Sequence, residues 1–168
     1  MNYILFVERE GFNSNKEAEL TINMLADPTA KPLLSLFAFV ENHLAGHILF
    51  TKAQFANDKD NISVSFLAPL AVLPRFQKQG IAGNLIKKGF KLLSKSGVDL
   101  VFVMGHPRYY PRFGFKPAAK FGFEPTYPIP EKVADAWMVK ALRPNIIGAV
   151  SGKMICCDTL NKPESWRE

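Results

Sequence analysis

Apolar residues along this chain follow two kinds of spacing, one helical and one typical of strands. From Ser14 to Leu25 they recur among polar residues, which predicts a helix with a serine or asparagine cap that ends before Asp27-Pro28. From Leu33 to Val40 and from Leu44 to Phe50 they run almost unbroken, with Glu41-Asn42-His43 between them. The two runs predict a β-hairpin.

A strand, a helix and a second strand follow in the middle of the chain. Ile62 to Val72 alternates at first and then becomes continuously apolar, as a strand does when it passes from a sheet margin to its buried centre. An amphipathic helix begins near Ile81 and ends at Gly97, and Val98 to Met104 is again nearly all apolar. This order predicts a βαβ unit with parallel, covered strands.

The remaining residues are expected to complete the sheet. Pro107 to Arg112 predicts one short helical turn, and Ala136 to Leu142 and Val150 to Cys157 predict two more strands. Asp158 to Glu168 is expected to form an exposed tail. Because the 168 residues contain no repeat, low-complexity tract or linker, the sequence predicts a single domain over residues 1–168.

Composition narrows the class of protein. No run of about 18 apolar residues exists, and no basic segment precedes the short apolar stretch at the start, so we expect a soluble, cytoplasmic protein with no membrane partner. Cys156 and Cys157 are adjacent, which excludes a disulfide framework and a spaced metal site; one of them is expected to face the core from a strand. We therefore expect no metal.

The net charge of +6 suits a nucleic acid, a membrane surface or an anionic small ligand. The placement of the basic residues favours the last, since two groups of them follow successive strands of the βαβ unit. A solvated helix face is the alternative explanation for the lysines. Nucleic acid is not expected, because interleaved exposed aromatics and a recognition helix are both missing. The basic residues are Lys78, Lys87, Lys88, Lys91, Lys95, Arg108, Arg112, Lys116 and Lys120.

The stretch Gln77-Lys78-Gln79-Gly80-Ile81-Ala82-Gly83 lies between the buried strand and the amphipathic helix. Backbone N–H groups of such a turn, together with the free N–H groups of the first helical turn, bind phosphate. Gly80 and the small residues after it allow a diphosphate to approach the main chain. The stretch lacks the Gly-Lys-Ser/Thr ending of a nucleoside-triphosphate loop and the three-glycine dinucleotide fingerprint.

The pattern Q-x-x-G-x-A resembles motif A of the GNAT superfamily of N-acetyltransferases. A second stretch, Tyr109 to Phe115, resembles motif B of that superfamily, with Tyr110 in the place of its tyrosine four residues before a Gly-Phe pair. The run from Pro69 to Pro74 is similar to a bacterial subgroup of predicted acetyltransferases. Together the two motifs, separated by one helix and one strand, are much more specific than either alone.

The resemblance implies an α/β (α+β) fold: a mixed, mostly antiparallel central sheet with one parallel βαβ splay and flanking helices. It further implies that acetyl-CoA lies with its pantetheine arm in the splay, as an added strand. Pro69 is consistent with a gap there, because it removes a backbone donor. The residues that the resemblance assigns to the cofactor are Leu70, Val72, Gln77, Lys78, Gln79, Gly80, Ile81, Ala82, Gly83 and Tyr109.

The implied reaction moves an acetyl group from the thioester to a primary amine by direct attack in a ternary complex. Tyr110 is the candidate acid for the leaving thiolate, with simple aromatic packing as the alternative and Tyr109 as the substitute. For a general base, His106 is the nearest titratable residue, with His47 and Glu41 behind it. A water chain, or an amine that loses its proton unaided, would make a base unnecessary.

The acceptor is expected to be a small-molecule or peptide amine, bound by two variable segments. These are Asn13 to Leu34 and Phe115 to Asp135, with Phe121, Phe123 and Tyr127 at the pocket lip. Two other interpretations stay open: a non-catalytic acyl-CoA sensor on the same fold, and, more weakly, a basic nucleic-acid-binding domain. A homodimer through an edge strand or the last strand also stays open.

Overall fold

The computed structural model describes residues 3–12 and 15–166. The helices are α1 (Tyr3–Phe12), α2 (Asn15–Ala26) and α3 (Ile81–Lys95). The strands are β1 (Leu34–Val40), β2 (His43–Phe55), β3 (Val64–Val72), β4 (Leu100–Met104), β5 (Lys116–Pro117), β6 (Phe123–Glu124), β7 (Trp137–Ala141) and β8 (Gly152–Ile155). Short 3-10 turns join them at Pro28–Ala30, Pro74–Phe76, Tyr110–Phe113, Ala119–Phe121, Glu131–Ala136 and Pro163–Trp166.

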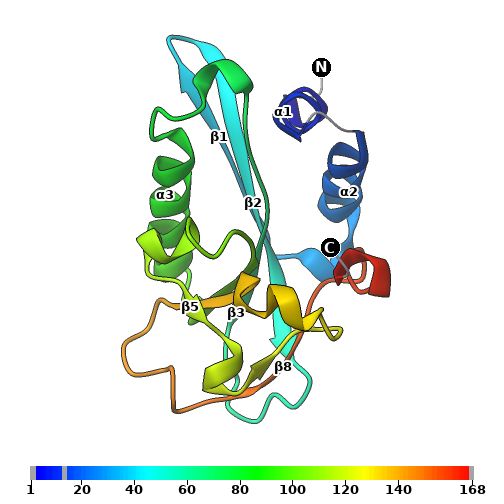
Figure 1. Cartoon of the computed structure of the whole chain (residues 1–168), viewed down its shortest axis with the longest axis vertical. Coiled ribbons are helices and arrows are strands. Elements are labelled where there is room, and N and C mark those ends of the chain that lie inside the picture. The colour runs from blue at the N-terminus through cyan, green and yellow to red at the C-terminus, as the bar shows by residue number, and fades with distance from the viewer. Residues whose placement is uncertain (1–2, 13–14, 167–168) are drawn as a thin grey trace.

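The strands form one mixed sheet in the order β5-β7-β4-β3-β2-β8-β6, with β1 paired to β2. The pairing of β3 with β4 is parallel, as is the short pairing of β6 with β8, and the other named pairs are antiparallel. In Figure 1, α3 covers one face of the long hairpin and α1 and α2 lie on the other side of it. The mixed sheet with flanking helices and the parallel βαβ unit are therefore confirmed.

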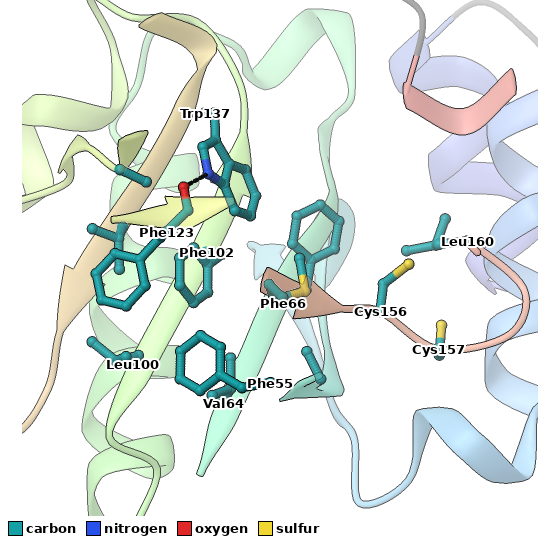
Figure 2. Packing of buried hydrophobic residues seen from close by; sticks show 14 of the residues in the cluster. Phe55, Val64, Phe66, Leu100, Phe102, Phe123, Trp137, Cys156, Cys157 and Leu160 are labelled. Carbon is teal, nitrogen blue, oxygen red and sulfur yellow. Dashed lines mark hydrogen bonds between the residues drawn. The ribbon is translucent and has the colours of Figure 1, made fainter. Parts of the chain in front are cut away.

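Period-two alternation along the strands divides the core between the two faces of the sheet. On the α3 face Ile48, Phe50 and Val101 pack with the apolar side of the helix. On the other face aromatic rings dominate, and Figure 2 shows Phe102 between Trp137 and Phe123. Trp137 Nε1 donates to the Phe123 carbonyl at 3.0 Å, so the indole N–H is satisfied inside the core.

Two sequence-based expectations are wrong, and the helix α1 at residues 3–12 lies where no element had been predicted. Residues 158–166 are no exposed tail, because Leu160 and Trp166 are buried. Trp166 packs on Phe66 and Trp137 and so closes the aromatic core. Both cysteines are buried just after the end of β8, rather than one of them within a strand. The expected serine cap at Ser14 lies outside the described residues.

Among the described helices, none combines the length and the apolar character needed to span a lipid bilayer.

Candidate functional site

The parallel strands β3 and β4 pair only over their first halves. Their register runs from Val64–Leu100 to Leu67–Val103 and stops there, so β3 continues without its neighbour. On its other edge, Leu73 N–H donates to the Ala45 carbonyl at 2.8 Å, in line with the register that pairs Val72 with Gly46. Hydrogen-bonded pairs alternate in antiparallel strands, so the amides of Leu70 and Val72 point away from β2 and into the gap.

The loop after β3 has a backbone shaped by two left-handed residues, Lys78 at φ 63° and Gly80 at φ 83°. Two side-chain amides stabilise the loop conformation: Gln77 Nε2 donates to the Val72 carbonyl at 3.0 Å, and Gln79 Nε2 donates to the Arg75 carbonyl at 3.1 Å. Gly80 is exposed, and a Cβ added to it would meet no atom within 4 Å. The loop is therefore open to solvent along its main chain.

Gly80 is also the N-cap of α3, with no side-chain hydrogen bond to the helix. The first intrahelical bond from the loop is Asn84 N–H to the Gly80 carbonyl at 3.0 Å, which leaves the N–H groups of the first turn without helical partners. The helix dipole adds positive potential at the same point. This end of α3 is suited to an anion, and a diphosphate fits the chemistry of the donor set.

A hollow of about 590 Å³ joins the loop to the gap. It extends from Val72 and Gly80 to the half-buried ring of Tyr109, and Phe113 lies against Gly83, where an added Cβ would be 3.1 Å from the ring. Eight residues assigned to the cofactor line it, namely Val72, Gln77, Lys78, Gly80, Ile81, Ala82, Gly83 and Tyr109. Leu70 and Gln79 are not among its lining residues, although both lie on the same continuous segment.

Tyr110 opens the short turn that follows β4 and packs more deeply than Tyr109. Its ring lies edge-on to Tyr109 and Phe115, with centroids 5.2 and 5.5 Å away, and it fills the space beside Gly105 where a Cβ would clash. Burial, with a smaller contribution from Tyr109, raises the pKa of Tyr110 above its usual value of 10. Burial also raises the pKa of Tyr109, opposed by the nearby Arg112 guanidinium.

The candidate bases occupy different environments. His106 is exposed, and its Nδ1 accepts from the Arg108 N–H at 3.1 Å, so the turn itself uses one ring nitrogen. Glu41 is exposed in the hairpin turn, at φ 49°. His47 is fully buried, bonded through Nδ1 to Glu8 Oε2 and through Nε2 to Ser35 Oγ, each at 2.7 Å.

The Ser35–His47–Glu8 cluster was not found from the sequence. Glu8 lies in a segment for which no element was expected, and its contact with His47 joins residues 39 positions apart. Burial raises the pKa of Glu8 against the lowering effect of His47. No local sequence pattern predicts this contact, because it depends on how α1 packs on β2.

The basic residues and the expected pocket lip are only partly at the site. Lys78 and Arg112 line the hollow. The α3 lysines Lys87, Lys88, Lys91 and Lys95 are all exposed, as on a solvated helix face. Phe123 is buried in the aromatic core, so the expectation that it forms a pocket lip is wrong; Phe121 and Tyr127 are half-buried against that core, and Phe121 lines a separate hollow.

Comparison with known proteins identifies the family. The family model for the acetyltransferase (GNAT) family matches residues 3–115. The chain is 42% identical over 153 residues to the uncharacterized N-acetyltransferase YjhQ of Escherichia coli K12, covering 90% of this chain and 84% of that protein. It is 29% identical over 145 residues to the uncharacterized N-acetyltransferase YhbS of the same strain, covering 86% and 83%.

Solved structures agree with this result. The crystal structure of YhbS from Escherichia coli in complex with CoA superposes with a TM-score of 0.84 at 26% identity, covering 96% of this chain and 86% of that one. A GNAT family acetyltransferase from Brucella melitensis in complex with acetyl-CoA gives a TM-score of 0.72 at 25% identity, covering 94% and 90%. The chain therefore belongs to the GNAT family of acetyltransferases.

Proposed function

We propose that this protein is an acetyl-CoA-dependent N-acetyltransferase that acts on a primary amine by direct attack in a ternary complex. The observation that carries the proposal is the open loop at Gly80, which leads from free helix N–H groups into the hollow beside the splayed strand. The complexes of the YhbS and Brucella proteins with CoA and acetyl-CoA support the same ligand here. We extend the proposal to one domain over residues 1–168 that works in the cytoplasm.

The chain's own groups divide the work of binding. The amides of Gly80 and of the first turn of α3 hold the diphosphate, with Gln77 and Gln79 fixing the loop from behind. The amides of Leu70 and Val72, which face the gap, bind the extended arm as a neighbouring strand would. An amide already aimed at the carbonyl oxygen stabilises negative charge there without reorganisation.

Acetyl-CoA supplies the acetyl group as a thioester, so the carbon–sulfur bond breaks as the carbon–nitrogen bond forms. The amine must lose one proton, and the leaving sulfur gains one. Tyr110 is the proposed donor of that second proton: its hydroxyl is protonated throughout the neutral range, and the pKa raised by burial makes it a weaker acid that donates as negative charge develops on the sulfur. His106 is the proposed acceptor of the first: its Nδ1 accepts the Arg108 N–H, so the neutral ring carries its own proton on Nε2 and takes a proton from water at Nδ1 when that hydrogen bond opens.

Two measurements test the proposal. Acetyl-CoA should raise the melting temperature of the native protein, as any ligand specific to the folded state does. Release of free CoA thiol across a library of primary amines should fall by about 10²–10⁴-fold in Tyr110→Phe, the range expected for a general acid. Tyr127→Phe is the matched control, because that half-buried ring packs on the aromatic core, on the face of the sheet opposite Tyr110.

The outcomes separate an enzyme from a sensor. Binding of acetyl-CoA with no thiol release from any amine would favour a non-catalytic acyl-CoA module. Turnover that survives Tyr110→Phe unchanged would remove Tyr110 from the chemistry and leave its ring a packing role against Gly105 and Phe115. Absence of any acetyl-CoA binding would overturn the proposed function altogether.

A further inference from the structure

A second hollow, of about 350 Å³, lies where the pairing of β3 with β4 ends. Ala68 and Met104, the residues directly after the last paired positions Leu67 and Val103, both line it. Leu67 and Val103 belong to the core under α3, whereas Ala68 and Met104 pack against the aromatic core on the other face. The hollow thus meets the strand gap from the face opposite α3.

The walls of this hollow come from segments far apart in the sequence. Leu20 of α2 and the indole of Trp166 face it together with Phe66 of β3, which gives an apolar interior. The C-terminal segment supplies Trp166 because it folds back onto Phe66, with ring centroids 5.4 Å apart. A hollow of this size holds a small molecule rather than a folded partner.

The carboxylate of Glu17 is a charged group in this mainly apolar wall. Glu17 lines the hollow, and its buried Oε2 has no hydrogen-bond donor among the described residues. Glu8 Oε1, on the neighbouring helix α1, is buried without a donor as well, and the charge of Glu17 acts on Glu8. Glu17 Oε2 is closed off from the hollow, whereas Glu17 Oε1 is not among the buried oxygens and can accept an N–H from an amine bound there.

We infer that this hollow is the acceptor site, and that it takes a small primary monoamine with an apolar or aromatic body whose nitrogen is held by Glu17. The inference rests on the function proposed above. The apolar body lies against Phe66, Leu20 and Trp166, and the nitrogen lies between Glu17 and the strand gap at Ala68. The acetyl group and the amine then approach each other through the gap from opposite faces of the sheet.

The charges around the hollow argue for one amino group rather than several. Lys16 and Lys162 line it along with Glu17 and Glu164, so the cations offset the carboxylates. A polyamine would bring two or three positive charges to a rim whose described residues carry two carboxylates and two ammonium groups, and its chain would gain little from the aromatic interior. An arylalkylamine matches both the half-buried carboxylate of Glu17 and the ring-lined wall.

Calorimetric titration of phenethylamine into the CoA-saturated protein tests this site. Wild type should bind it, and Glu17→Gln should weaken binding by about tenfold or more, the effect of losing one charge-assisted hydrogen bond. Glu19→Gln is the matched control, because Glu19 is exposed on the same helix and does not line the hollow. Leu20→Trp should block the hollow and abolish phenethylamine binding, while 2-phenylethanol should bind wild type more weakly than the amine.

The proposal fails if CoA-saturated wild type does not bind phenethylamine, if Glu17→Gln leaves its affinity unchanged, or if spermidine binds more tightly. Acetyl-CoA affinity is measured separately for each variant and should be the same in all of them. If wild type does not bind acetyl-CoA, the proposed function is overturned. If acetyl-CoA binds but Glu17→Gln leaves the affinity for phenethylamine unchanged, only the acceptor site is overturned.

Discussion

At the scale of single residues, Gly80 combines two properties that few positions share. Its left-handed backbone, at φ 83°, is one that residues with a Cβ adopt at a cost of about 1–2 kcal/mol, and the space above it is empty. The first property shapes the loop, and the second leaves the main chain accessible to a diphosphate. A side chain there would stand in the space that we assign to the ligand.

Gly80→Glu should therefore abolish acetyl-CoA binding while the protein stays folded, because a carboxylate would occupy the position of the diphosphate and repel it. The matched control is Gly97→Glu at the other end of α3, where φ is 87° and the space is equally open. Both variants carry the same backbone strain and the same charge, so their melting temperatures without ligand should be similar. Calorimetry that finds unchanged affinity in Gly80→Glu would remove the loop from the binding site.

The sequence predicts residues of this kind well, since their chemistry is local. The loop at Gly80 is recognisable because a tight turn, free amides and a helix start are consecutive in the chain. Glu17 and Trp166 are different, because they line one hollow while lying on segments about as far apart in sequence as the chain allows. No sequence pattern near Glu17 or Trp166 indicates that the two residues lie close together, so their proximity can be seen only in the folded structure.

At the scale of elements, the strands and α3 were predictable because their periodicity is uninterrupted over many residues. The helix α1 was not, since its sequence YILFVEREGF begins with a solid apolar run that lacks helical alternation. Its helical form follows from docking on the sheet: Val7 and Glu8 are fully buried, and Gly11 lies against Ala71 of β3. Tertiary packing therefore decides the structure where the local pattern does not.

The docking of α3 depends on Gly89, which faces the fully buried ring of Phe50 on β2 so closely that an added Cβ would clash. Gly89→Ala should lower the free energy of unfolding by about 1–3 kcal/mol through overpacking, despite the better helix propensity of alanine. Ser94→Ala, at an exposed position of the same helix, should be neutral or slightly stabilising. Urea denaturation measures both.

A double-mutant cycle identifies the cause of that loss. Phe50→Leu removes the ring atoms that the new methyl group would meet, so Gly89→Ala should cost much less in the Phe50→Leu background than in wild type. If the two substitutions were simply additive, contact between α3 and this ring would not limit how closely the helix approaches the sheet.

At the scale of the whole molecule, hydrogen bonds to Asp27 connect the N-terminal part of the chain, after α2, with the C-terminal part, after β8. Its carboxylate accepts from the N–H and hydroxyl of Thr29 at 2.8 and 2.7 Å, and from the N–H and hydroxyl of Thr159 at 2.9 and 2.8 Å. Thr159 belongs to the segment that carries Trp166 back to the aromatic core. The connection therefore supports the wall of the second hollow and the end of α2 together.

This connection should make stability depend on acid pH. Burial alone would raise the pKa of Asp27, but the bonds from Thr29 and Thr159 outweigh it and hold the pKa well below its usual range. A depressed pKa means that the stabilisation is complete above the ordinary value of 3.8 and is lost as the pH falls toward the folded-state value. Asp27→Asn should cost about 1–3 kcal/mol at pH 7, because the amide nitrogen cannot accept the donors it faces.

The difference between wild type and Asp27→Asn should therefore narrow as the pH is lowered from 7 to below about 4, where the wild-type carboxylate begins to lose its advantage. Urea midpoints measured across that range test the sign directly. Asp158→Asn is the control, since Asp158 is exposed and contributes only its backbone N–H to Thr29. A gap between wild type and Asp27→Asn that stays constant with pH would mean that the carboxylate's charge is not what joins the two ends of the chain.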